Sequence, residues 1–190
     1  LTLPDEAAFF RTPEATASWS RMYLSLARHV PDHFFVLQGD SDEKAIATLI
    51  SHGLDVLPDQ VRSFGYVEVW AQHLEDRDLL IGARIHGSMM AFYAAVPSLL
   101  VAVDVRQLEL ARAMHVAHVA RTDPAFQELM GADEFDLAAF VALPQLQFNG
   151  TAFDERRHAV AQQYALSLES LGMQPNPRWS DALVKSKRPQ

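Results

Sequence analysis

Residues 78–104, DLLIGARIHGSMMAFYAAVPSLLVAVD, hold an arginine, a histidine and a glycine inside an otherwise apolar run. Arg84 could bind a carboxylate or a phosphate through two parallel hydrogen bonds, which a lysine cannot do. His86 could donate or accept a proton near neutral pH, or hold a phosphate as an imidazolium. Gly87 and Ser88 would add backbone and hydroxyl donors. These four residues together predict a compact site for a small anion.

The group lies where a strand is expected to end and a helix to begin. Ligands of parallel α/β sheets bind outside the carboxyl ends of the strands, and the first amides of a helix are free to bind an anion. We expect the helix to begin near Ser88, with Gly87 leaving room for a ligand. Arg84 and His86 are two residues apart, so in an extended chain they project to the same side.

A structural role for the same residues is the alternative. An arginine at a strand end is often paired with a nearby carboxylate, and a histidine at a turn often caps a helix or bonds a carbonyl group. Both interpretations are open from the residues alone.

Further polar residues follow two other predicted strands. Arg106 is a candidate for a second anion contact, and Asp104 would orient it or cap the next helix; we favour the cap, because aspartate is a preferred N-cap residue. Asp40 and Asp42 follow an earlier strand, where they could bind the hydroxyl groups of an acceptor or cap their own helix.

The elements that must position these residues alternate along the chain. The pattern predicts strands over 33–40, 61–66, 78–83, 97–104 and 116–120, and helices over 15–28, 40–53, 67–77, 88–95 and 106–115. The strands are continuous apolar runs, which is typical of strands covered on both faces. The predicted fold class is therefore α/β, with a doubly wound, mostly parallel, Rossmann-like sheet.

The chain divides into three predicted parts. Residues 1–121 form the Rossmann-like domain with the anion site. Residues 122–173 are a helical extension that packs on it, and the pattern over 151–172 predicts a long amphipathic helix with Phe153, Val160, Tyr164, Leu168 and Leu171 in register. Residues 174–190 are polar and proline-rich, which predicts a surface or disordered tail.

Composition narrows the classes of function. The 190 residues are 49% hydrophobic, which suits one globular domain, and the net charge of −8 disfavours a nucleic-acid surface. The absence of cysteine excludes disulfides, thiolate zinc sites and a cysteine nucleophile. The metal-binding, dinucleotide and P-loop motifs are missing, so neither a metal nor a cofactor is expected. No apolar run reaches the roughly 20 residues of a transmembrane helix, and we expect a cytoplasmic protein.

Several of these features occur in a fixed order. A strand ends in Arg-Ile-His-Gly, and a small-residue helix, a Val-Pro turn, a further strand and an Asp followed by a basic residue come after it. In this, residues 78–119 resemble the polysaccharide pyruvyl transferase family, and residues 34–43 and 64–70 agree more loosely. The resemblance implies a GT-B-like fold with two Rossmann-like halves, of which this chain would hold mainly the C-terminal one.

The resemblance also implies a reaction, the transfer of pyruvate from phosphoenolpyruvate to a sugar of an exopolysaccharide or cell-surface glycan as a ketal. Arg84 and His86 would be catalytic. The donor anion would be bound by Arg84, Gly87, Ser88 and Arg106, and the acceptor would be oriented by Asp104 or Asp40. The expected partners are this anionic donor and a sugar or lipid-linked saccharide, and a homo-oligomer is compatible with the sequence.

Two other functions are kept as alternatives. A glycosyltransferase of the same fold would bind a nucleotide sugar in the same crevice. A non-catalytic binding or assembly module would use Arg84 and His86 only to join strand to helix.

Overall fold

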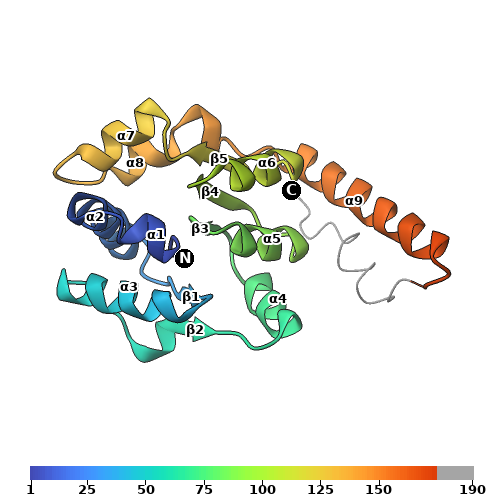
Figure 1. The fold of residues 1–190 in the computed structure, drawn as a ribbon, viewed down its shortest axis with the longest axis horizontal. Helices are drawn as coiled ribbons and strands as arrows, with labels where there is room; N and C mark the ends of the chain where they lie inside the picture. The colour runs from blue at the N-terminus through green and yellow to red at the C-terminus, as the bar shows by residue number, and fades with distance from the viewer. Residues whose placement is uncertain (175–190) are drawn as a thin grey trace.

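A computed structural model describes residues 1–174 and shows an α/β chain whose strands are all parallel (Figure 1). β1 (Phe35–Leu37) pairs with β2 (Val61–Ser63). β3 (Leu80–Gly82), β4 (Ser98–Ala102) and β5 (Ala117–Ala120) form a second group in that order. Thr2 forms parallel bridges with Val36 and with Gly82, so the N-terminal segment lies between β1 and β3 and joins the two groups.

The helices alternate with the strands. They are α1 (Glu6–Phe9), α2 (Pro13–His29), α3 (Asp40–Ser51), α4 (Val67–Glu75), α5 (Ile85–Tyr93), α6 (Val105–Ala113), α7 (Pro124–Gly131), α8 (Leu137–Val141) and α9 (Gly150–Ser170), with 3-10 turns η1 (Pro58–Gln60) and η2 (Pro144–Leu146). Most begin at a side chain that accepts a hydrogen bond from a first-turn amide, as N-cap preferences predict; these caps are Asp5, Thr12, Asp104, Asp123, Asp136 and Asn149.

The helices cover both faces of the strands. On one face α2, α3, α7 and α8 bury an apolar cluster that includes Trp19, Leu49, Phe126 and Phe140. On the other face α4, α5 and α6 pack against β3 and β4 through smaller clusters. In Figure 1 the first group of helices lies to the left of β3 and β4 and the second to the right. The strands are apolar along their whole length because side chains are buried on both sides.

The predicted strands and helices through β5 are all present, although the strands are shorter and several helix ends are shifted by one to three residues. α5 begins at Ile85, three residues before the predicted start near Ser88. The prediction was wrong because Gly87 was taken to precede the helix, whereas it lies inside the first turn. Ile85 is buried, and this apolar anchor draws the start of the helix toward the strand.

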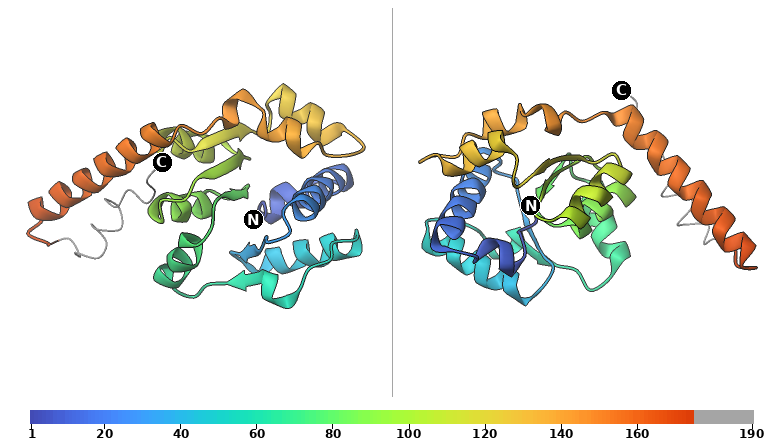
Figure 2. Two further views of the ribbon diagram at one scale, coloured as in Figure 1. Left: turned by 180° about the vertical axis from the view of Figure 1, so that it is seen from behind. Right: turned by 45° about the horizontal axis from the view of Figure 1, so that its top comes forward.

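Among residues 1–174, the packing of helix α9 is concentrated at its beginning. Phe153 meets the Phe92 ring edge-on, with 5.1 Å between ring centroids, and the buried Arg157 donates from Nε to the carbonyl oxygen of Phe92 at 2.6 Å. Arg157 therefore binds the carboxyl end of α5. Further along, Tyr164 and Leu171 are exposed, and α9 extends away from the strands in both views of Figure 2. Within residues 1–174, the predicted apolar face of this helix is buried only over its first half.

Two further predictions concern the C-terminal tail and transmembrane helices. The predicted tail lies outside the described residues except for Gln174. Within residues 1–174, none of the helices combines the length and the hydrophobicity needed to cross a bilayer.

Candidate functional site

The predicted site residues come together at one edge of the strands. β3, β4 and β5 are parallel neighbours, so their carboxyl ends meet at the same edge. Arg84 follows β3, and Asp104 and Arg106 follow β4; Arg121, which was not among the predicted site residues, follows β5. Sequence spacing predicts this edge correctly.

The guanidinium of Arg84 is turned toward α3 rather than toward solvent. Its Nη2 forms an ion pair with Asp42 and lies 3.4 Å from the hydroxyl oxygen of Ser41. The side chain of Arg84 is 14% exposed and that of Asp42 only 1%. Asp42 also accepts a hydrogen bond from the amide of Gln38 at 2.6 Å. Arg84 therefore ties the β3–α5 turn to the first turn of α3, which is the structural role kept as the alternative.

Asp42 does not use all the donors of the guanidinium. Nε of Arg84 is buried without a hydrogen-bond partner. Nη1 makes no hydrogen bond with any residue of the described chain. Burial raises the pKa of Asp42, although the Gln38 amide and the Arg84 charge oppose that rise. Within residues 1–174, the pair with Asp42 thus leaves Nε and Nη1 of the Arg84 guanidinium without a hydrogen-bond partner.

The N-terminal segment fills the space beside this pair. The hydroxyl of Tyr23 donates to the carbonyl oxygen of Thr2 at 2.7 Å, and burial, with the nearby charge of Asp42, raises the pKa of Tyr23. A Cβ added to Gly87 would stand 2.7 Å from the Thr2 side chain. The expectation that Gly87 leaves room for a ligand is therefore corrected, because Thr2 already fills that room.

The role expected for Ser88 also changes. The amide of Ser88 donates to the carbonyl oxygen of Arg84 at 3.5 Å, because Ser88 is the fourth residue of α5 rather than its start. Its hydroxyl is fully buried and has no partner in the described chain. The amides that precede the first helical hydrogen bond belong to Ile85, His86 and Gly87.

His86 is exposed in the first turn of α5 and makes no hydrogen bond or ion pair with residues 1–174. The extended spacing that would align it with Arg84 does not occur, because Arg84 is the extended N-cap residue and His86 is helical. The two side chains have different surroundings, one packed against α3 and one open to solvent.

The end of β4 is more open. Asp104 caps α6 by accepting from the Gln107 amide at 2.7 Å, as favoured from the sequence. Its second oxygen lies 3.8 Å from Nη2 of Arg106, whose side chain is 66% exposed. Arg106 is therefore available to a ligand. Asp40 is exposed at the first position of α3, at the same edge.

Asp42 was considered from the sequence for acceptor hydroxyls or a helix cap but not as the partner of Arg84, although the sequence carries a signal for its burial. Asp42, Ala45, Ile46 and Leu49 are the buried positions of α3. They follow the spacing of one helix face, so the aspartate belongs to the apolar face and requires a partner.

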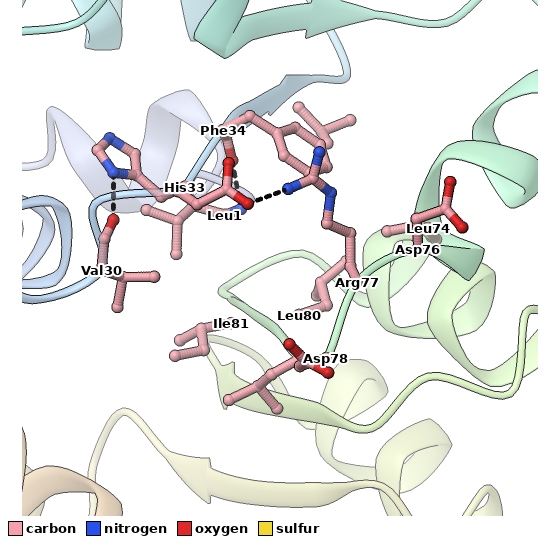
Figure 3. A pocket seen from close by; sticks show the side chains of 13 residues that line it. Leu1, Val30, His33, Phe34, Leu74, Asp76, Arg77, Asp78, Leu80 and Ile81 are labelled. Carbon is pink, nitrogen blue, oxygen red and sulfur yellow. Dashed lines mark hydrogen bonds and ion pairs between the residues drawn. The ribbon is translucent and has the colours of Figure 1, made fainter. Parts of the chain in front are cut away.

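A separate cavity of about 220 Å³ opens at the amino ends of the strands, at the opposite edge (Figure 3). Phe34, Leu80 and Ile81 line it, and at its rim Arg77 pairs with Asp32 at 3.0 Å and stacks on the Phe34 ring. Asp76 and Asp78 also line it, so its charge does not favour an anion, and ligands of parallel sheets bind at the carboxyl edge.

Comparison of this chain with protein-family models, curated proteins and solved structures finds no match. Within residues 1–174, no three or more His, Asp or Glu side chains are arranged to hold a metal ion. The family resemblance of residues 78–119 stays a prediction.

Proposed function

We propose that this chain is the donor-binding half of a pyruvyl transferase-like enzyme. In this proposal it transfers pyruvate from phosphoenolpyruvate to a sugar as a ketal, and its doubly wound, Rossmann-like fold is one half of a GT-B-like architecture. The observation that carries the proposal is the placement of His86 and Arg106, two exposed groups that follow neighbouring parallel strands at the carboxyl edge.

The coverage of the strands supports the fold part of the proposal. The chain after Thr2 passes to α1 and α2 on one face, and the chain after β3 passes to α5 on the other face. In doubly wound folds a crevice forms where successive connections leave for opposite faces, and ligands bind there. Arg84 and His86 lie beside that point.

The reaction can be divided among these groups. A proton adds to the methylene carbon of phosphoenolpyruvate, the central carbon forms bonds to two sugar oxygens, and the bond to the phosphate oxygen breaks. Of the two hydroxyl protons, one replaces the proton delivered to the methylene carbon and the other leaves with phosphate. His86 delivers the proton to carbon, because an imidazole exchanges protons near neutral pH.

The anionic groups of the donor require fixed cations. Arg106 and the first amides of α5 bind the phosphate, since a helix N-terminus and an exposed guanidinium both favour negative charge. The unbonded Nη1 of Arg84 is directed to the donor carboxylate, and Asp42 acts as a positioning residue for that guanidinium. The amide of Gly87 is one of these first amides, whereas its missing side chain and the buried Ser88 hydroxyl serve packing at the start of α5.

Titration calorimetry with phosphoenolpyruvate tests this proposal. We expect measurable binding to the unaltered protein and about tenfold weaker binding after Arg106→Ala, the loss typical of one charge-assisted contact. His86→Ala should retain the fold and weaken binding as well. The matched controls are Arg112→Ala, at the other end of α6, and His52→Ala, at the end of α3; both residues are exposed.

Three results would contradict the proposal. Binding that neither Arg106→Ala nor His86→Ala changes would place the donor elsewhere. Binding of a nucleotide sugar without binding of phosphoenolpyruvate would indicate the glycosyltransferase alternative. A folded protein that binds neither compound would indicate a non-catalytic module.

A further inference from the structure

A large cavity lies between α2 and α7, apart from the residues assigned to the donor. Its volume is about 700 Å³, and it is lined by the turn between α1 and α2, the start of α2, the turn after β5 and part of α7. α2 and α7 pack side by side on the same face of the strands (Figure 1). Because Arg121 follows β5 directly, the cavity opens at the same carboxyl edge as the donor site.

Two arginines that have no side-chain partner among residues 1–174 line this cavity. Arg11 and Arg121 line it, and neither forms a hydrogen bond or ion pair through its guanidinium with residues 1–174. The neighbouring Arg21 behaves differently, because it donates to the carbonyl oxygen of Met130 at 2.9 Å and helps to hold the wall. Asp123 forms no ion pair with Arg121; its oxygens instead cap α7 and accept from Gln145 at 2.9 Å.

One carboxylate lies in the same cavity. Glu14, in the first turn of α2, has its pKa lowered by its own backbone amide and by the Thr12 hydroxyl, so it is ionised at neutral pH. A carboxylate repels a bare anion, but it accepts hydrogen bonds from hydroxyl groups. The lining therefore combines two guanidinium forks with one acceptor for hydroxyl groups.

We infer that this cavity binds a phosphorylated saccharide. The phosphoryl group contacts Arg11 and Arg121, which match its geometry as bidentate donors, and a sugar hydroxyl donates to Glu14. A cavity of this size accommodates a sugar phosphate. The assignment of this ligand as the acceptor in pyruvyl transfer rests on the proposed function, whereas the binding site itself does not.

Glucose 1-phosphate is the probe, with inorganic phosphate and glucose as comparison ligands. Calorimetry measures affinity, and the NMR signals of the indole N–H groups report location, because Trp19 lines the cavity whereas Trp70 packs against Phe64 elsewhere. Binding should shift the Trp19 signal, and Arg11→Ala and Arg121→Ala should each weaken affinity about tenfold. Arg62→Ala, on the exposed part of β2, is the control.

Glu14→Gln tests whether the cavity recognises the saccharide as well as the phosphate. This variant should tighten binding of inorganic phosphate, because a repulsive charge is removed, and it should reduce the preference for glucose 1-phosphate over inorganic phosphate. If the preference is absent in the unaltered protein, or is unchanged in Glu14→Gln, the saccharide part of the inference is wrong.

The result can be told apart from failure of the proposed function. Arg121→Ala should weaken binding of glucose 1-phosphate about tenfold and leave binding of phosphoenolpyruvate unchanged, and Arg106→Ala should have the reverse effect. Sugar phosphate binding without phosphoenolpyruvate binding would retain this site and contradict the proposed reaction. Absence of sugar phosphate binding, or binding that neither arginine variant changes, would overturn the inference.

Discussion

The turns after β3 and β4 carry similar residues in different environments. Each contains an arginine that forms an ion pair with an aspartate at the carboxyl edge. Arg84 is 14% exposed and its partner Asp42 comes from α3, more than 40 positions earlier. Arg106 is 66% exposed and its partner Asp104 caps the same turn. Arg84, which pairs with an aspartate from another helix, is mostly buried, whereas Arg106, which pairs with an aspartate of its own turn, is mostly exposed.

This difference decides which arginine the fold depends on. Exposed ion pairs contribute about 0–1 kcal/mol, whereas removing one partner of a buried pair costs about 3–5 kcal/mol. We therefore expect Arg84 to affect mainly stability and, under the proposed function, Arg106 to affect mainly binding.

The largest effect is expected from Gly82→Ala, at the end of β3. A Cβ at Gly82 would stand 1.9 Å from the hydroxyl oxygen of Thr2 and 2.4 Å from its carbonyl oxygen. Ordinary overpacking costs about 1–3 kcal/mol. Here the obstacle includes backbone of the bridging segment, so we expect a loss of more than about 3 kcal/mol in urea unfolding.

Gly65→Ala is the matched control for that substitution. Gly65 also follows a strand, β2, and has no atom within 4 Å of an added Cβ. Its unfolding free energy should change by less than about 1 kcal/mol. Equal losses in the two variants would show that the β3–α5 turn is not closed by Thr2.

A smaller effect is expected from Arg84→Met, which removes the charge and retains most of the side-chain volume. Asp42 then stays buried without its partner, and we expect a loss of about 2–3 kcal/mol, less than for a fully buried pair because part of Arg84 meets solvent. Arg106→Met should change stability by less than about 0.5 kcal/mol. Urea unfolding of both variants measures the difference.

Binding of phosphoenolpyruvate should rank the same two variants in the reverse order. Arg106→Met should weaken binding more than Arg84→Met does, once measurements are made well below the unfolding transition. A stability loss in Arg106→Met equal to that in Arg84→Met would remove the distinction between the two turns.

Much of the fold follows from the sequence because periodicity and caps act locally. Continuous apolar runs predicted β3 and β4, and Asp104 was correctly favoured as a cap. The role of Thr2 was not foreseen, since a bridge to both Val36 and Gly82 depends on where the N-terminal segment lies. The exposed second half of α9 was missed because an apolar pattern does not show whether a neighbour covers it.

The candidate site was predicted less well than the fold. The edge was correct, because the carboxyl ends of parallel strands must meet. The direction of the Arg84 side chain was not, because its partner Asp42 belongs to another element. Gly87 was interpreted as open space, and only the tertiary structure shows that Thr2 occupies it. Local signals thus place a residue at an edge, and long-range packing decides what it contacts.

The smallest expected effect is on pH dependence, and it tests the buried side of the comparison. Burial raises the folded-state pKa of Asp42 above its unfolded value of 3.8. The native state therefore holds the proton more readily than the unfolded state. The stability that this contributes is fully present below pH 3.8 and is lost as the pH rises through the folded pKa.

Asp42→Asn removes that contribution, so the unfolding free energy of the unaltered protein minus that of Asp42→Asn should fall as the pH rises from 3.8 through the folded pKa. In Arg84→Met the Asp42 carboxyl has lost its cation, so its pKa rises further. The unfolding free energy of Arg84→Met minus that of the double variant Arg84→Met/Asp42→Asn should therefore fall more steeply with pH. Asp40→Asn corrects for the loss of a carboxylate from the first turn of α3. A difference that rises with pH would mean that the ion pair outweighs burial and that Asp42 is held as a carboxylate. The turn after β3 would then be stabilised by the charges of Arg84 and Asp42, and it would differ from the turn after β4 only in how its ion pair is packed.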